Sequence, residues 1–245
     1  MTAAGAAPVR AVFFDVGETL INETREYGTW ADWLGVPRHT FSAMFGAVIA
    51  RGEDYRQVFQ HFRPGFDLAE ERRLRLEAGL GEYFNARDLY PDVRGCLAAL
   101  KERGFLVGIA GNQTARAGQF IRELHLPADV IATSDDWGAE KPTPAFFDKL
   151  IASAGMSPEE IAYVGDRLDN DILPAADAGL FTVWIKRGPW AFAQADHPEG
   201  RRAHLRIDTL DALLRAFVRE SRLGDSSAHG NARPSGSLIT GPDGH

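Results

Sequence analysis

The stretch that decides the fold is Ala11-Val12-Phe13-Phe14-Asp15-Val16-Gly17-Glu18-Thr19-Leu20, where a short apolar run ends at a carboxylate. Residues 11–15 combine aromatic and β-branched side chains without a helical period, which is typical of a buried strand. An acid at the tip of such a strand is either a loop or helix-capping carboxylate or a nucleophile that forms a covalent intermediate. Other parts of the sequence are needed to distinguish a capping carboxylate from a nucleophile.

A second acidic cluster follows the apolar run 161–164, in the stretch Gly165-Asp166-Arg167-Leu168-Asp169-Asn170-Asp171. Acids placed so close together repel one another unless a cation lies among them. Carboxylate oxygens are ligands that Mg²⁺ prefers, so Asp166, Asp169 and Asp171 are candidate metal ligands. The alternative is a loop rich in capping acids, in which Asp169 or Asn170 caps the following helix.

Length and composition limit the class of protein. The chain has 245 residues, 44% of them hydrophobic, which is enough for one α/β domain with an insertion. Its net charge of −7 argues against partners such as nucleic acid or an anionic membrane. Cys96 is the single cysteine, so no internal disulfide can form, and a reducing cytoplasm fits. We expect a cytoplasmic monomer or homodimer, with no signal peptide or membrane span.

The order of patterns along the chain predicts a core with an insertion. Residues 22–88 carry helical periodicity and no convincing strand, including a charged helix from Leu68 to about Ala86 that Asp67 caps. Beyond it, strands alternate with helices, which implies a mostly parallel sheet. The expected later strands are 105–110, 130–133, 161–164 and 181–185. We therefore assign 8–21 and 89–222 to the core, 22–88 to a helical insertion, and the Gly-, Ser- and Pro-rich segment 223–245 to a disordered tail.

Polar residues follow several of the expected strands. Asp15, Asn112, a loop that reaches Lys141, and Asp166 each come after one strand. Ligands of parallel α/β sheets bind at the carboxyl ends of the strands, so we expect these side chains to converge. Pro142 and Pro144 stiffen the loop around Lys141, which lowers the entropic cost of placing its ammonium group.

These stretches resemble a known family. Asp15 to Leu20, Gly111-Asn112, Lys141-Pro142-Thr143-Pro144 and Gly165-Asp166 to Asp171 are similar, in order and spacing, to the motifs of the haloacid dehalogenase-like (HAD) hydrolase superfamily. The resemblance covers about residues 10–220, and the segment 22–88 matches the position of that family's helical cap (subfamily I type). It implies an α/β fold with a Rossmann-like parallel sheet core and an inserted helical cap.

The resemblance also implies roles for particular residues. Asp15 would be the catalytic nucleophile, and Lys141 the bridging cation that holds it. Mg²⁺ would be the cofactor, bound by Asp15, the carbonyl of Gly17 and Asp166, with Asp171 as a nearby acid of the metal shell. The implied reaction is hydrolysis of a small phosphorylated molecule through an aspartyl-phosphate.

Two positions depart from the family pattern. Phosphatases of the family carry a second Asp two residues after the nucleophile, as general acid and base, and here that position is Gly17. They also carry Ser or Thr at the position of Gly111, so the Asn112 side chain, backbone amides and Lys141 remain to bind phosphate. General acid–base catalysis is typically worth ~10²–10⁴-fold, so we expect weakened acid catalysis and a preference for good leaving groups. Glu18 is one residue too far along for a simple replacement, although it could act through water.

Other functions stay open on the sequence alone. A 2-haloacid dehalogenase would also lack the second Asp, and Arg25 or Arg38 could hold the carboxylate of a halogenated substrate. Phosphonoacetaldehyde-type cleavage needs a Lys in the cap, and 22–88 contains none. A catalytically impaired member acting as a binding protein is the remaining alternative.

A few further side chains are candidates for the site. In the insertion, Tyr27, Trp30 and His39 lie near the entrance in sequence, and His61 is a possible acid–base group. Trp137, just before Lys141, either forms a wall of the site or packs in the core.

Overall fold

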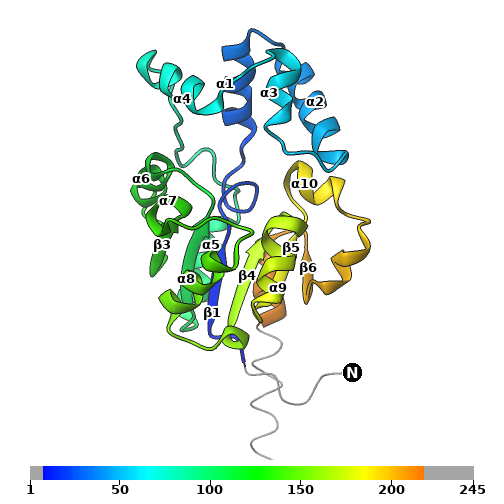
Figure 1. Cartoon of the computed structure of the whole chain (residues 1–245). Helices are drawn as coiled ribbons and strands as arrows, with labels where there is room; N and C mark the ends of the chain where they lie inside the picture. Colours follow the sequence, from blue (N-terminus) through cyan, green and yellow to red (C-terminus); the bar gives the residue numbers. More distant parts are fainter. Residues whose placement is uncertain (1–7, 218–245) are drawn as a thin grey trace, which may run out of the picture.

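The computed structural model describes residues 8–217 and contains one parallel sheet with the strand order β3-β2-β1-β4-β5-β6 (Figure 1). This confirms the predicted Rossmann-like α/β core. The strands are β1 (Ala11–Phe14), β2 (Leu106–Gly111), β3 (Val130–Thr133), β4 (Ile161–Gly165), β5 (Phe181–Ile185) and β6 (Leu205–Ile207). The sequence interpretation missed β6, a three-residue strand that pairs with β5 at the edge of the sheet.

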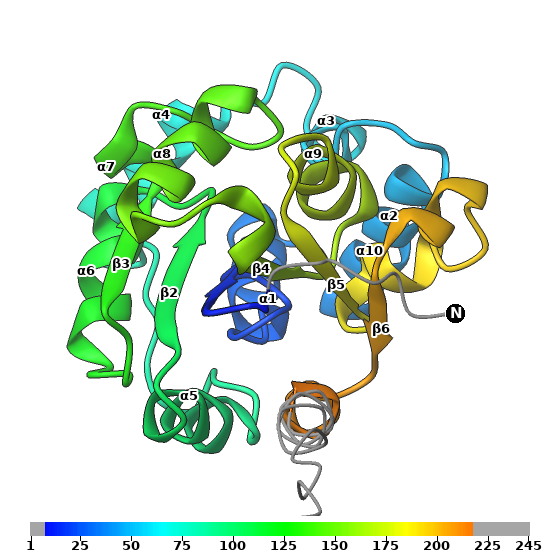
Figure 2. The same ribbon diagram turned by 90° about the horizontal axis from the view of Figure 1, so that it is seen from below.

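Alternate residues of β1 pack on opposite faces of the sheet, because successive side chains of a strand point to opposite sides. Val12 and Phe14 join one hydrophobic cluster, whereas Ala11 and Phe13 join another. Both faces are therefore buried, as is usual for parallel sheets. Figure 2 shows helices on both sides of the strands. The first cluster includes side chains of α5 (Val93–Glu102), α6 (Ala115–Glu123) and helical residues 210–217, and the second includes α8 (Pro144–Ala154) and α9 (Leu173–Asp177).

A side-chain cap marks the start of α6, where the Thr114 side chain accepts a hydrogen bond from the N–H of Ala117. The chain after β4 begins as the π-helical turn η2 (Leu168–Ile172) and continues as α9. Short elements that the sequence interpretation did not separate are α7 (Ser134–Trp137), α10 (Gly188–Ala193) and the 3₁₀ turns η1 (Pro158–Glu160) and η3 (Pro198–Arg202).

The inserted segment is helical and stands over the carboxyl ends of the strands (Figure 1). Its helices are α1 (Thr24–Leu34), α2 (Arg38–Ala50), α3 (Gln57–Phe62) and α4 (Leu68–Glu77). They enclose a hydrophobic cluster of their own, in which Trp30, Phe41 and Phe59 are buried. Trp190 of α10 joins the same cluster, so the core contributes to the packing of the insertion.

One predicted helix is too long. The Asp67 side chain accepts hydrogen bonds from the N–H groups of Ala69 and Glu70, so α4 begins where the sequence indicates. It ends at Glu77 rather than near Ala86, because Gly79 adopts a φ of 73° and residues 79–81 contain two glycines. The residues between α4 and α5 form turns and chain without a regular helix or strand.

Two further expectations concern the ends of the chain and membranes. The tail assigned to residues 223–245 lies outside the described residues, as does the end of the core segment assigned to 89–222. Within 8–217, no helix has the length and apolar character needed to cross a bilayer. Cys96 is fully buried in α5.

Candidate active site

Asp15 follows β1, between the carboxyl ends of β2 and β4. Its backbone N–H donates to the carbonyl of Val164 at 2.9 Å, which continues the ladder by one residue. The chain then turns through Glu18, a non-glycine residue with a φ of 52°. Strained backbone of this kind persists where surrounding contacts impose it. Here the hydroxyl of Tyr90 donates to Oε2 of Glu18, and the N–H of Glu23 donates to Oε1.

Lys141 joins two carboxylates in the interior. Its Nζ lies 2.5 Å from Oδ1 of Asp15 and 2.6 Å from Oδ1 of Asp171. Burial alone would lower the pKa of Lys141, but the charges of Asp15 and Asp171 outweigh burial and hold this pKa well above its usual value. The ammonium group is therefore charged and is shared by residues that follow two different strands.

The Asn112 side chain holds the Lys141 loop against the end of β2. Its Nδ2 donates to the carbonyl of Lys141 at 2.8 Å, and its Oδ1 accepts the N–H of Lys141 at the same distance. This two-way contact fixes the backbone of Lys141. The sequence interpretation assigned Asn112 to phosphate binding, and in this structure its amide also positions the lysine.

Three buried carboxylates meet beside Lys141. Ligand atoms of Asp15, Asp166 and Asp171 lie within 4.8 Å of one another, and these residues are only 7%, 2% and 0% exposed. Burial raises the pKa of Asp15 to about 6, although Lys141 acts in the opposite direction. Burial, together with the charges of Asp171 and Asp15, raises the pKa of Asp166 well above its usual range.

This donor set fits a divalent cation. Oδ2 of Asp166 is buried and has no hydrogen-bond partner among the described residues. An unpaired buried carboxylate oxygen is costly, and the ammonium of Lys141 forms its ion pairs with Asp15 and Asp171 rather than with Asp166. A hard cation with oxygen ligands, such as Mg²⁺, would satisfy the remaining charge.

Gly111, at the end of β2, lies directly against Asp15. A Cβ atom at position 111 would lie 2.5 Å from Oδ1 of Asp15, so glycine leaves the space that this carboxylate occupies beside Lys141. Position 111 thus offers backbone groups but no side chain to a ligand.

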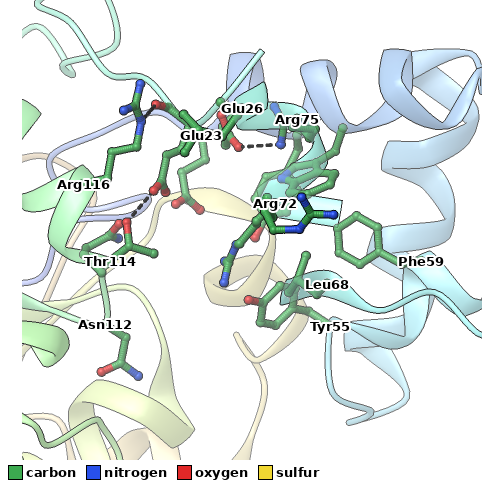
Figure 3. Close-up of a pocket in the computed structure, with 17 residues that line it drawn as sticks. Glu23, Glu26, Tyr55, Phe59, Leu68, Arg72, Arg75, Asn112, Thr114 and Arg116 are labelled. Atoms are coloured by element: carbon green, nitrogen blue, oxygen red, sulfur yellow. Dashed lines mark hydrogen bonds and ion pairs between the residues drawn. The ribbon is translucent and has the colours of Figure 1, made fainter. Parts of the chain in front are cut away.

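A cavity of about 510 Å³ opens above the carboxylates. It is lined by core residues, including Asp15, Asn112 and Lys141, and by residues of the insertion. A second cavity, of about 360 Å³, shares several lining residues with it and extends under the insertion. Figure 3 shows Asn112 and Thr114 from the core facing Tyr55 and Arg72 from the insertion across this second cavity.

Glu23 is the residue that sequence reasoning missed. It immediately precedes α1 and lines both cavities. Burial raises the pKa of Glu23 well above its usual value, and the charges of Glu18 and Asp15 act in the same direction. Nothing in the local sequence distinguishes Glu23 from neighbouring acids such as Glu26, so only the fold could identify it.

Several other candidates lie away from the carboxylates. Asp169 pairs with Arg167 and accepts from Gln194, and it is not part of the buried triad. Arg25 is bound to Asp88 and Arg38 to Asp32, and neither arginine lines the two cavities. The remaining candidates divide as follows: His39 and His61 are exposed, Trp137 packs on Phe146, and Tyr27 and Trp30 line a cavity.

The fold and the site together define a Rossmann-like α/β protein whose polar residues gather at the carboxyl edge of a parallel sheet. The chain belongs to the haloacid dehalogenase-like hydrolase family, whose model matches residues 9–179.

Similar proteins include phosphatases. A glyceraldehyde 3-phosphate phosphatase of Pyrococcus furiosus is 30% identical over 233 residues, which cover 87% of this chain and 95% of that protein. A phosphoserine phosphatase of Thermus thermophilus is 31% identical over 184 residues, which cover 70% of this chain and 72% of that protein. The crystal structure of a HAD phosphatase from Thermococcus onnurineus superposes with a TM-score of 0.55 at 24% identity. The match covers 85% of this chain and 98% of that protein. The last of these is a likeness of fold.

Proposed function

We propose that this protein is a Mg²⁺-dependent phosphohydrolase that acts through an aspartyl-phosphate on Asp15. The observation that carries the proposal is the buried cluster in which Lys141 bridges Asp15 and Asp171 beside the unpaired oxygen of Asp166. A cluster of this kind is costly to the fold, and a cavity opens directly above it. Perturbed, buried acids in a cavity are typical of functional sites.

In the proposed reaction, an Asp15 oxygen attacks the phosphorus of the substrate and the bond to the ester oxygen breaks. Lys141 holds the Asp15 carboxylate in place and offsets the negative charge that develops on the transferring group. Bound Mg²⁺, held by Asp15, Asp166, Asp171 and the carbonyl of Gly17, would neutralise phosphate charge and orient the group. Water then releases phosphate and restores Asp15.

Phosphate oxygens would be bound by Lys141, by backbone groups at Gly111, and by the second N–H of the Asn112 amide, whose first N–H is used by Lys141. Gly17 supplies no acid. Unless another group provides a proton, the absence of a carboxyl there disfavours substrates with poor leaving groups.

The helical segment 22–88 would serve as the cap that closes over the substrate and excludes water. The two cavities, which share several lining residues, suit a small phosphorylated molecule. Relatives named for glyceraldehyde 3-phosphate, phosphoglycolate and phosphoserine define the first panel of substrates to try.

The test is phosphate release from this panel, p-nitrophenyl phosphate and acetyl phosphate, with Mg²⁺ and with EDTA, for the wild type and Asp15→Asn. We expect turnover that needs both Mg²⁺ and Asp15. Asp15→Asn keeps the shape of the side chain, so unchanged melting with lost turnover would support the covalent role. Turnover that survives the substitution would overturn it, and chloride release from 2-chloropropionate would instead indicate a dehalogenase.

A further inference from the structure

The carboxylate of Glu23 occupies the space that a side chain at position 17 would fill. A Cβ atom built on Gly17 would lie 2.8 Å from Oε1, 2.9 Å from Cδ and 3.1 Å from Oε2 of Glu23. Real Cβ atoms do not approach other atoms so closely, so a side chain at position 17 would require the Glu23 carboxylate to leave its present place. The departure at position 17 and the placement of Glu23 are therefore two aspects of one arrangement.

The structure holds the backbone of Glu23 and leaves its carboxylate free. Its N–H donates to Oε1 of Glu18 at 3.1 Å, and its carbonyl accepts the N–H of Tyr27 at 3.0 Å in the first turn of α1. The side chain makes no hydrogen bond or ion pair within residues 8–217 and lines the same cavity as Asp15. Glu18, by contrast, is engaged by Tyr90 and is the poorer candidate.

We propose that Glu23 is the catalytic acid and base of the reaction, in place of the side chain missing at position 17. This inference rests on the proposed function and names the proton donor that Gly17 cannot supply. As the phosphorus–oxygen ester bond breaks, its electron pair stays on the leaving oxygen, which takes the proton of the Glu23 carboxylic acid. In the second step the Glu23 carboxylate takes a proton from water, the water oxygen bonds to phosphorus, and the bond to Asp15 breaks. Both side chains return to their starting states.

The first experiment compares two substrates of nearly the same shape, phenyl phosphate and p-nitrophenyl phosphate, because only the former needs a proton on its leaving group. Glu23→Gln removes the proton and keeps the size of the side chain. We expect kcat/KM for phenyl phosphate to fall by ~10²-fold or more, and that for p-nitrophenyl phosphate by about tenfold or less. Asp32→Asn, which removes an exposed carboxylate from α1, the helix that follows Glu23, should change neither.

The second experiment moves the acid back to position 17. Gly17→Asp combined with Glu23→Ala places a carboxyl at 17 and clears the space that Glu23 fills. This double variant should recover activity on phenyl phosphate relative to Glu23→Ala alone.

The outcomes separate the two proposals. Loss of all turnover in Asp15→Asn, with the substrate-dependent loss in Glu23→Gln and rescue by the double variant, supports both. An Asp15-dependent wild type in which Glu23→Gln affects the two substrates equally, or not at all, overturns the role of Glu23 and leaves the phosphohydrolase standing. Turnover that does not depend on Asp15 refutes the phosphohydrolase mechanism itself.

Discussion

Lys141 and Asp171 form a buried ion pair, with Nζ 2.6 Å from Oδ1 and both side chains almost fully shielded from solvent. Asp171 comes from the turn after β4, whereas Lys141 comes from the loop after β3 and α7. The same ammonium contacts Asp15 after β1, so one lysine connects three segments of the sheet edge. The site and the stability of this edge therefore depend on the same contacts.

Replacing Lys141 should destabilise the metal-free protein as well as inactivate it. Lys141→Met leaves the buried Asp15 and Asp171 carboxylates without their cation. Breaking a buried pair in this way costs about 3–5 kcal/mol, which urea denaturation in EDTA would measure as a loss in the free energy of unfolding. Lys149→Met, on the exposed side of α8, is the matched control and should change that free energy by less than about 0.5 kcal/mol. Equal stabilities for the two variants would contradict this account.

Trp190 should hold the helical segment 22–88 in place. It belongs to α10 of the core, and its ring centroid lies 5.1 Å from that of Phe45 and 5.9 Å from that of Tyr55, both in the insertion. Trp190→Ala removes this buried contact and should cost about 3 kcal/mol in the free energy of unfolding. KM should rise as well, because the segment that covers the cavity loses its support.

Phe192 on the same helix provides the control for Trp190. It is 64% exposed, so Phe192→Ala should leave both the free energy of unfolding and KM close to wild-type values. If Phe192→Ala raised KM as much as Trp190→Ala, general damage to α10 would explain the effect better than the contact with the insertion.

Cys96 should be chemically silent in the folded protein. Burial raises the pKa of its thiol to about 12, so at about pH 8 the reactive thiolate is almost absent and the sulfur is also inaccessible. We expect negligible reaction with Ellman's reagent under native conditions and rapid stoichiometric reaction in denaturing urea. Rapid labelling of the native protein would show that α5 opens readily.

Much of the core could be predicted because its signals are local. The apolar run 11–14 and the capping residue Thr114 each specify an element within a few positions. Where local signals were weak, prediction was wrong or incomplete. The helix from Leu68 was extended past Gly79, and β6 was missed because three residues carry too little pattern. Short edge strands depend on the neighbour they pair with more than on their own composition.

The sequence by itself determined the parallel sheet and the convergence of Asp15, Lys141 and Asp166 at one edge, because strand and helix periodicities are local and parallel strands present their carboxyl ends together. Only the tertiary structure decided which side chains from distant segments contact one another in the site. It placed Glu23 against Gly17 and engaged Asn112 with the backbone of Lys141. Such contacts join segments that are separate in sequence, and their geometry follows from how whole elements pack.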